Sequence, residues 1–404
     1  MRLKPGKKLL FRLLTGAMGL IIGVFVIEIG LRLIDYSNPE FYSVDEILGY
    51  SLTPNASGRY RKEGLSFVQI NSDGFRDVEH AVEKPAGVYR IALVGDSYVE
   101  GLQVSRDEMF SNFVGAVVGR CRAPDSQRVE ILNFGVSGYG TAQELLLMRQ
   151  KAWKYSPDLV LLVMTTNNDI SDNIRVFKRT SVPYFVLQNG ELSLDDSFRQ
   201  ERSFTAKNSG LSRAGTWLKQ NLRFVQGVGE ATVKAKYWYN DVRTSRAPGA
   251  AEGGPPAAAP VADVGIDNQV YRTPADDNWN TAWNVTEALI SQIRKETEAN
   301  GAKFAVVTGS NGVQVLPAVE QRAAYAKYLG VNDLLYPDRR IAEYCRSKGI
   351  SVITLAPELG EYAAANNVFL HGFEGNLGYG HWNQVGHRVA GEAIGRHLCE
   401  EVIR

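Results

Sequence analysis

Short apolar runs alternate with segments of helical periodicity after residue 90, and this alternation most limits how the chain can fold. The third run, Leu159–Met164, is apolar throughout, as expected for a parallel strand covered on both faces. Strands that alternate with helices predict an α/β fold, a doubly wound and mostly parallel five-stranded sheet between two helical layers. The expected strands are Ile91–Val94, Val129–Leu132, Leu159–Met164, Lys303–Val307 and Ile350–Leu355, and the expected helices are Asp107–Val118, Thr141–Trp153, Thr281–Asn300, Asp338–Lys348 and Gln384–Val402.

Other segments flank or interrupt this alternation. Residues 35–88 are turn-rich and are expected to lead into the main domain, 89–404, and to wrap it. Residues 175–280 form an insertion of weak periodicity. Within it, 243–276 is rich in proline, alanine and glycine, and we expect a flexible loop because the segment has too little apolar surface to bury. Another long loop is expected over 357–380, before the last helix.

An uncharged run, Leu13–Ile27, follows five basic residues at the amino terminus. Extended as a helix to residue 34, it is long enough to span a bilayer, with Glu28 and Arg32 spaced to pair near the far interface. Basic residues on its amino side keep that end in the cytoplasm, which places the main domain in the periplasm or outside the cell. A cleaved signal peptide is the alternative, but bulky side chains occupy the region before Asp35 where a cleavage site would lie. Residues 1–34 are therefore expected to be an uncleaved single-pass anchor.

Charge and cysteine usage argue against several classes of partner. A formal net charge of +1 gives no basis for expecting nucleic acid. The three cysteines, Cys121, Cys345 and Cys399, allow at most one internal disulfide, and buried thiols are the favoured interpretation. None has metal-ligand spacing, and His381 and His387 have no acid pair beside them. We expect neither a metal nor another cofactor.

Polar clusters follow the ends of the expected strands. They are Gly95-Asp96-Ser97, Ser137-Gly138, Asn167-Asn168-Asp169 and, between the last strand and the last helix, Gly380–His387. Because the carboxyl ends of parallel strands share one edge of a sheet, the four clusters can converge there. Ser97 is then a candidate nucleophile, which needs a base within hydrogen-bond reach and donors for the oxyanion. On its own Ser97 would more simply be a turn or helix-capping residue, and the other clusters favour the catalytic interpretation.

In their order along the chain these clusters resemble the four blocks of the SGNH family, the GDSL-type esterases and acyltransferases. The matching segments are Val94–Gly101, Asn133–Gly138, Asn168–Asp169 and His381–His387, and Ile70–Asp77 is similar to a segment that often precedes the first block in bacterial envelope-associated members. The resemblance covers roughly 47–180 and 280–404. It implies a flavodoxin-like fold, Ser97 as nucleophile and His381 as general base. It also implies an oxyanion hole made by the backbone amides of Ser97 and Gly138 and by the Asn168 carboxamide.

One position departs from the family pattern. Members with a full triad usually carry aspartate three residues before the histidine, whereas this chain has Gly378 there. The favoured interpretation is a Ser97–His381 dyad in which a backbone carbonyl orients the imidazole. An acid from elsewhere, Glu374 or Asp172, is the alternative.

The resemblance implies a serine esterase or O-acyltransferase that acts through an acyl-Ser97 intermediate on small acyl groups, acetyl first, of carbohydrate. Water as the acceptor would make it an esterase, and a sugar hydroxyl would make it a transferase. The expected partners are a carbohydrate or other small acyl ester, the membrane and the machinery of envelope polysaccharide. A non-catalytic carbohydrate-binding or polysaccharide-assembly subunit is the alternative. The missing aspartate favours it, and the retained Ser97, Gly138, Asn168 and His381 argue against it.

Overall fold

The computed structural model describes residues 5–122, 128–166, 168–245 and 267–403, and its central element is a five-stranded sheet. The strands are β5 (Val88–Gly95), β6 (Arg128–Gly135), β7 (Leu159–Met164), β10 (Lys303–Thr308) and β11 (Ser351–Thr354). Their order is β11-β10-β7-β5-β6, and every neighbouring pair is parallel. The predicted sheet is therefore confirmed. Because β5 lies between β6 and β7, the chain reverses its direction of winding at β5.

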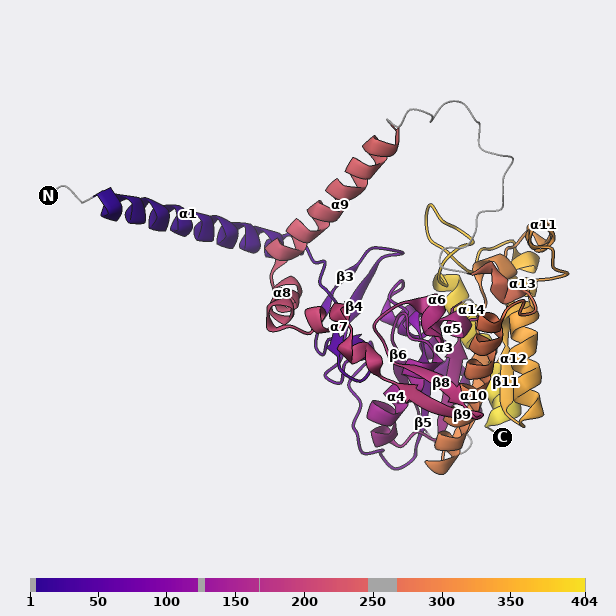
Figure 1. Ribbon diagram of the computed structural model, residues 1–404. Coiled ribbons are helices and arrows are strands. Elements are labelled where there is room, and N and C mark those ends of the chain that lie inside the picture. The colour runs from indigo at the N-terminus through magenta and orange to yellow at the C-terminus, as the bar shows by residue number, and fades with distance from the viewer. Residues whose placement is uncertain (1–4, 123–127, 167, 246–266, 404) are drawn as a thin grey trace.

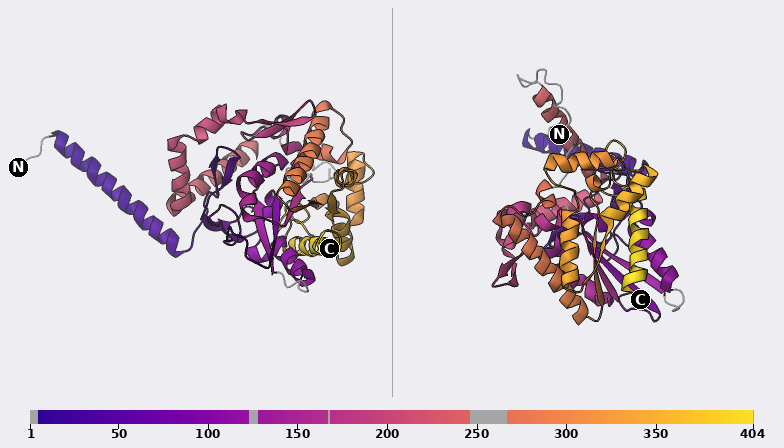
Figure 2. Two further views of the ribbon diagram at one scale, coloured as in Figure 1. Left: turned by 90° about the horizontal axis from the view of Figure 1, so that it is seen from below. Right: turned by 90° about the vertical axis from the view of Figure 1, so that its right-hand side faces the viewer.

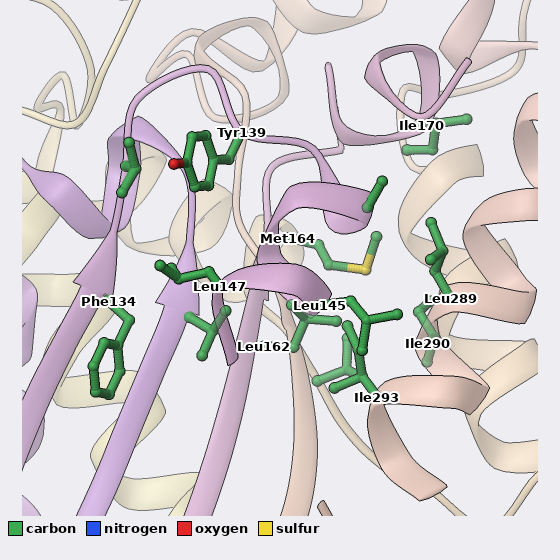
Figure 3. Close-up of a cluster of buried hydrophobic side chains, with 14 of the residues drawn as sticks. Phe134, Tyr139, Leu145, Leu147, Leu162, Met164, Ile170, Leu289, Ile290 and Ile293 are labelled. Carbon is green, nitrogen blue, oxygen red and sulfur yellow. The ribbon is translucent and has the colours of Figure 1, made fainter. Parts of the chain in front are cut away.

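Helices cover both faces of this sheet, as predicted. One layer contains α3 (Phe110–Arg122), α13 (Leu355–Asn366) and α14 (Gln384–His397), and the other contains α4 (Thr141–Leu147), α10 (Asp277–Ala299) and α12 (Tyr336–Ser347). Side chains of β5 alternate between the two cores, with Ile91 and Leu93 in the first and Ala92 and Val94 in the second. Figure 3 shows part of the second core, where Leu162 of β7 lies among side chains of α4 and α10.

Helix α13 occupies the first part of the segment expected to be a long loop, so that expectation is wrong there. Leu355, Leu359 and Ala363 recur at helical spacing and are buried against the sheet, which makes an amphipathic helix the stable choice. The remainder, up to residue 380, consists of turns and one isolated bridge between His371 and Trp382.

The segment before β5 forms two antiparallel hairpins on the main domain. They are β1 (Tyr42–Asp45) with β2 (Gly49–Leu52), and β3 (Ser57–Tyr60) with β4 (Ser66–Gln69). Leu48, Leu52 and Val68 are fully buried in the same core as Leu162. This burial fixes the hairpins, and so the turn between β3 and β4, against the sheet.

The described part of the insertion contains four helices, of which α9 is the longest, and a further hairpin. The elements of the insertion are α6 (Arg175–Lys178), β8 (Tyr184–Gln188), β9 (Glu191–Asp195), α7 (Arg202–Lys207), α8 (Gly210–Asn221) and α9 (Arg223–Ser245). Outside it lie the further helices α2 (Ser97–Glu100), α5 (Asp169–Asp172) and α11 (Val319–Leu329). The loop expected to be flexible was 243–276; its first three residues instead belong to α9, and 246–266 lies outside the described residues. The expectation of a flexible loop is wrong near its end, where a 3-10 turn at Asn268–Tyr271 packs Val270 and Tyr271 into the core.

Helix α1 (Pro5–Leu33) projects away from the main domain (Figures 1 and 2). Its stretch Phe11–Leu33 is long and apolar enough to cross a membrane, and its most apolar part is not buried in the fold. Glu28 and Arg32 form the ion pair expected near its end, at 2.7 Å.

A disulfide joins Cys121, in the last turn of α3, to Cys399, just after α14. The expectation of buried thiols is therefore wrong for these two residues, and it is confirmed for Cys345, which is buried and free. Residues 278 apart in sequence meet because α3 and α14 pack side by side on one face of the sheet.

Candidate active site

Ser97 lies where β5 ends and α2 begins. Oδ1 of Asp96 caps this short helix by accepting a hydrogen bond from the backbone N–H of Tyr98 at 3.0 Å. Since β5 is the strand at which the winding reverses, Ser97 occupies the position where open α/β sheets form their ligand crevice. Ser97 is partly exposed while its neighbours Asp96 and Tyr98 are buried, so its hydroxyl is presented to solvent.

His381 reaches Ser97 from the far end of the chain. Its Nε2 lies 2.8 Å from the Ser97 Oγ, within hydrogen-bond distance. His381 stands just before α14, and the N-cap of that helix, Asn383, accepts a hydrogen bond from the Gly386 N–H at 3.0 Å. Two residues expected to work together are thus brought together by the sheet edge.

Glu63 completes a line of three side chains. One carboxylate oxygen, Oε2, lies 2.5 Å from Nδ1 of His381, and the other accepts a hydrogen bond from the His381 backbone N–H at 2.8 Å. Glu63 sits in the turn between β3 and β4, so the segment preceding the sheet supplies it. Gly380 has a φ of +78°, and a Cβ there would overlap the Glu63 carboxylate. Glycine at 380 is therefore what allows Glu63 to approach.

This contact replaces the expected ways of orienting His381. The expectation of a backbone carbonyl at Nδ1 is wrong, because Glu63 occupies that position. Asp172 instead pairs with Lys178 at 2.8 Å, and Glu374 is exposed on the loop before His381. The sequence offered only a faint signal for Glu63: an acidic residue followed by glycine in a turn between two short strands.

The protonation of Glu63 and His381 follows from their contacts. Burial alone would raise the pKa of Glu63, but the hydrogen bonds and the positive charge that His381 can offer outweigh it and lower that pKa below its ordinary value. Glu63 is therefore an acceptor at neutral pH, and Nδ1 of a neutral His381 carries the proton. Nε2 is then free to accept the proton of the Ser97 hydroxyl.

A second histidine holds the loop that carries His381. Nδ1 of His371 lies 2.7 Å from the Gly380 carbonyl oxygen, and its Nε2 lies 2.9 Å from Oγ of Ser310, which also accepts from Trp382 Nε1 at 2.9 Å. Burial lowers the pKa of His371 to about 4, so the ring is neutral, donates through Nδ1 and accepts through Nε2. This histidine fixes the backbone next to His381.

Asn168, the expected side-chain oxyanion donor, is oriented by Asp96. Its Nδ2 donates to Asp96 Oδ2 at 3.2 Å, while Asp96 Oδ1 accepts from Thr165 Oγ1 at 2.9 Å. Burial raises the pKa of Asp96, and these hydrogen bonds oppose that rise. One hydrogen of the Asn168 amide is thus fixed on Asp96, which sets the direction of the other.

Gly138, the expected backbone donor, lies in a turn held by Glu100. The Ser137 backbone N–H donates to Glu100 Oε2 at 2.5 Å, and Tyr42 donates to the same oxygen at 2.9 Å. Gly138 has a φ of +76°, and a Cβ there would stand 2.8 Å from the Tyr50 hydroxyl. Glycine suits this position because it adopts positive φ without strain and has no Cβ that would crowd the Tyr50 hydroxyl.

A cavity of about 690 Å³ opens beside Ser97, Gly138 and His381, and Asn168 is not among the residues that line it. Ser97, Gly138 and His381 contribute to its lining, together with residues of the β1–β2 and β3–β4 hairpins and of the insertion. Three lysines, Lys62, Lys207 and Lys219, reach it from three different segments. Over the ranges that the structure describes, no group of three or more His, Cys, Asp or Glu side chains could hold a metal ion.

No protein-family model matches the chain, and no curated protein matches its sequence. Several solved structures resemble it. An acetyl xylan esterase is 11% identical over 76% of this chain and 99% of that chain, with a TM-score of 0.38. A member of the lipolytic G-D-S-L family from Veillonella parvula is 13% identical over 78% and 99%, with a TM-score of 0.34.

A catalytic variant of an acetylxylan esterase from Geobacillus stearothermophilus is 12% identical over 77% of this chain and 94% of that chain, with a TM-score of 0.35. Likenesses this distant assign neither an activity nor a substrate, so the chemistry of the site has to come from its own geometry.

Proposed function

We propose that this chain is a membrane-anchored serine esterase or O-acyltransferase that acts outside the cytoplasm on small acyl esters, acetyl first, of carbohydrate. The observation that supports it most is the unbroken line of hydrogen bonds from Glu63 through His381 to the Ser97 hydroxyl at the base of a cavity. A nucleophile, a base and a group that orients the base are the parts that acyl transfer through serine requires.

In the first half-reaction Ser97 Oγ attacks the ester carbonyl carbon while His381 Nε2 takes the hydroxyl proton. The imidazolium that forms is stabilised by the Glu63 carboxylate. Negative charge develops on the carbonyl oxygen, where the backbone N–H groups of Ser97 and Gly138 and the free amide hydrogen of Asn168 act as donors. The ester C–O bond then breaks, His381 returns the proton to the leaving alkoxide, and the acyl group remains on Ser97.

In the second half-reaction His381 removes a proton from the acceptor, which attacks the acyl-Ser97 carbonyl. Ser97 leaves and recovers its proton from His381. Water as the acceptor gives the free acid, and a sugar hydroxyl gives a new ester. Both outcomes use the same residues, so the acceptor alone separates an esterase from a transferase.

Two further observations support the proposed location. The exposed apolar stretch of α1 has the length and composition of a membrane anchor. The Cys121–Cys399 disulfide is typical of proteins that fold in an oxidising compartment outside the cytoplasm.

The non-catalytic alternative loses its main support. It rested on the missing aspartate before His381, and Glu63 now stands where that carboxylate would act.

A fluorophosphonate probe and an acetyl ester test the proposal together. The full chain in detergent should be labelled on Ser97 and should release acetate, and Ser97→Ala should abolish both. Ser347→Ala, at an exposed serine that ends α12 and does not line this cavity, is the matched control and should retain both. Adding an oligosaccharide acceptor then separates the two reactions, since transfer yields acetylated sugar at the expense of free acetate. An unlabelled Ser97 in folded protein would contradict the enzymatic proposal.

A further inference from the structure

Helix α8 presents two different sides. Ser212, Thr216 and Lys219 line the cavity over Ser97. Leu211 and Leu218, seven residues apart and so on a common side of the helix, are 88% and 38% exposed, and Trp217 beside them is 58% exposed. A water-soluble surface rarely gathers a tryptophan and two leucines on one short helix, so this side of α8 is suited to an apolar environment.

The end of α8 is attached to the end of α1. Arg32 Nη2 donates to the Asn221 carbonyl oxygen, the last residue of α8, at 2.8 Å. One turn earlier on α1, Glu28 Oε2 accepts from the Phe224 backbone N–H at the start of α9, also at 2.8 Å. These bonds fix the corner between α8 and α9 beside the last turns of α1, and Figure 1 shows α8 on the side of the domain from which α1 departs.

The same contacts set the depth of α8 relative to a bilayer. At 1.5 Å per residue, the uncharged run Leu13–Ile27 of α1 extends about 22 Å, most of the thickness of a hydrocarbon core of about 30 Å, so the charged residues on either side of it lie near the two boundaries of that core. Glu28 and Arg32, which follow directly and are engaged in polar contacts, then lie at the boundary with the headgroups. Since α8 ends against Arg32, Trp217 and Leu218, which lie near that end of the helix, stand close to this level.

We propose that α8 lies on the outer surface of the bilayer that α1 spans, with Leu211, Trp217 and Leu218 inserted among the headgroups. This inference rests on the membrane anchoring proposed above. A helix with leucine and tryptophan on one side and polar or basic residues on the other is the type that binds at a membrane surface, where tryptophan is enriched. The bilayer is the occupant favoured by continuity, because α8 and the anchor are joined by hydrogen bonds.

The position of α8 has a consequence for the site. Its inner side is a wall of the cavity and its outer side contacts lipid, so the cavity lies between the bilayer surface and the edge of the sheet. An acyl ester or glycan carried on a lipid would reach Ser97 without leaving the membrane surface.

Tryptophan quenching by lipid tests this proposal. The full chain is reconstituted in liposomes of phosphatidylcholine with brominated acyl chains, and its fluorescence is compared with that in unbrominated liposomes. Trp217→Phe should lose most of the bromine-dependent quenching. Trp153→Phe, a matched substitution at a half-buried site of the main domain, should retain it. A Leu211→Glu, Leu218→Glu double variant should remain anchored and lose the quenching of Trp217.

Flotation of the liposomes after alkaline washing separates the two proposals. If the chain does not float with the lipid, the anchoring itself fails, and α8 fails with it. If the chain floats and Trp217→Phe leaves the bromine quenching unchanged, the inference about α8 is overturned and the anchor stands. Shielding of Trp217 from both brominated lipid and aqueous iodide would also overturn it, since a second protein copy would then cover this face.

Discussion

Glu63 and His381 lie 318 residues apart in sequence, and the Glu63 carboxylate contacts both Nδ1 and the backbone N–H of His381. The double contact fixes the orientation of the imidazole as well as its position. The carboxylate that orients the His381 imidazole therefore comes from a hairpin turn that precedes the sheet.

Removing the Glu63 carboxylate should greatly lower kcat while leaving the fold intact. Glu63→Gln should lower kcat on an acetyl ester by about 10³- to 10⁴-fold, because Nδ1 loses the acceptor that holds the reactive tautomer. Steady-state kinetics measures the loss. Gly380→Ala, whose Cβ would displace Glu63, should reproduce much of it, and Glu374→Gln should not. Full activity in Glu63→Gln would indicate that Ser97 and His381 act as a dyad that needs no orienting acid.

Asn168→Ala should lower kcat by about 10²- to 10³-fold with a smaller change in KM, since an oxyanion donor acts mainly in the transition state. Labelling of Ser97 by a fluorophosphonate should slow in parallel. Asn112→Ala, at an exposed position of α3, serves as the control and should behave as wild type. Equal kcat values in the two variants would show that Asn168 is not an oxyanion donor.

His387 should make the protein less stable as the pH falls. Burial lowers its pKa to about 3, and its Nδ1 accepts from the Phe110 N–H at 3.2 Å, so the native ring stays neutral. In the unfolded chain the ring is protonated below about pH 6.5. The unfolded state then binds the extra proton, and the free energy of unfolding falls by about 1.4 kcal/mol per pH unit from pH 6.5 toward 3.

The measurement is the difference between wild type and His387→Gln in urea unfolding at several pH values. Buried carboxyls with raised pKa values, such as Asp338 at about 6, act in the opposite direction but are common to both proteins and cancel. The variant should be less stable at pH 8, where it loses the bond to Phe110, and its stability should depend less on pH below 6.5. Parallel curves would contradict the prediction.

The three cavity lysines should favour anionic substrates. Among the residues described, none of Lys62, Lys207 and Lys219 forms an ion pair, and they face the same cavity from separate segments. Replacing all three with glutamine should raise KM for an acylated acidic oligosaccharide roughly tenfold, since exposed charge contacts contribute about 0.2–1 kcal/mol each. KM for a neutral acetyl ester should stay the same. An equal rise for both substrates would indicate that the lysines shape the cavity instead.

Reducing the Cys121–Cys399 disulfide should destabilise the main domain by about 2–4 kcal/mol, because the closed loop restricts the unfolded chain. Urea unfolding with and without a reductant shows the effect. The Cys121→Ser, Cys399→Ser double variant should be insensitive to reductant. A wild-type protein equally insensitive would show that the bond contributes nothing to stability.

The parts that the sequence predicted are those with local or periodic signals. Apolar runs such as Leu159–Met164 mark the strands, and the polar residues that end them, Ser97 and Asn168 among them, meet because parallel strands share an edge. Helix α13 was not predicted because Pro357 in its first turn and Gly360 at its middle resemble loop signals, whereas its burial depends on the neighbouring sheet.

Glu63 could not be predicted for a different reason. Its role depends on how two hairpins pack against the main domain, and no period or spacing in the sequence links residue 63 to residue 381. The pairing of Cys121 with Cys399 likewise depends on two helices, α3 and α14, that become neighbours only in the folded sheet.

The origin of Glu63 also ties the chemistry of the site to the packing of the segment before β5. The turn between β3 and β4 belongs to the stretch that joins the anchor to the first strand of the sheet, so a fragment beginning at β5 would retain all five strands, Ser97 and His381. Such a fragment would lack the acid and also the buried hairpin side chains Leu48, Leu52 and Val68, so loss of this stretch would take the orienting carboxylate from His381 and open the core of the main domain together.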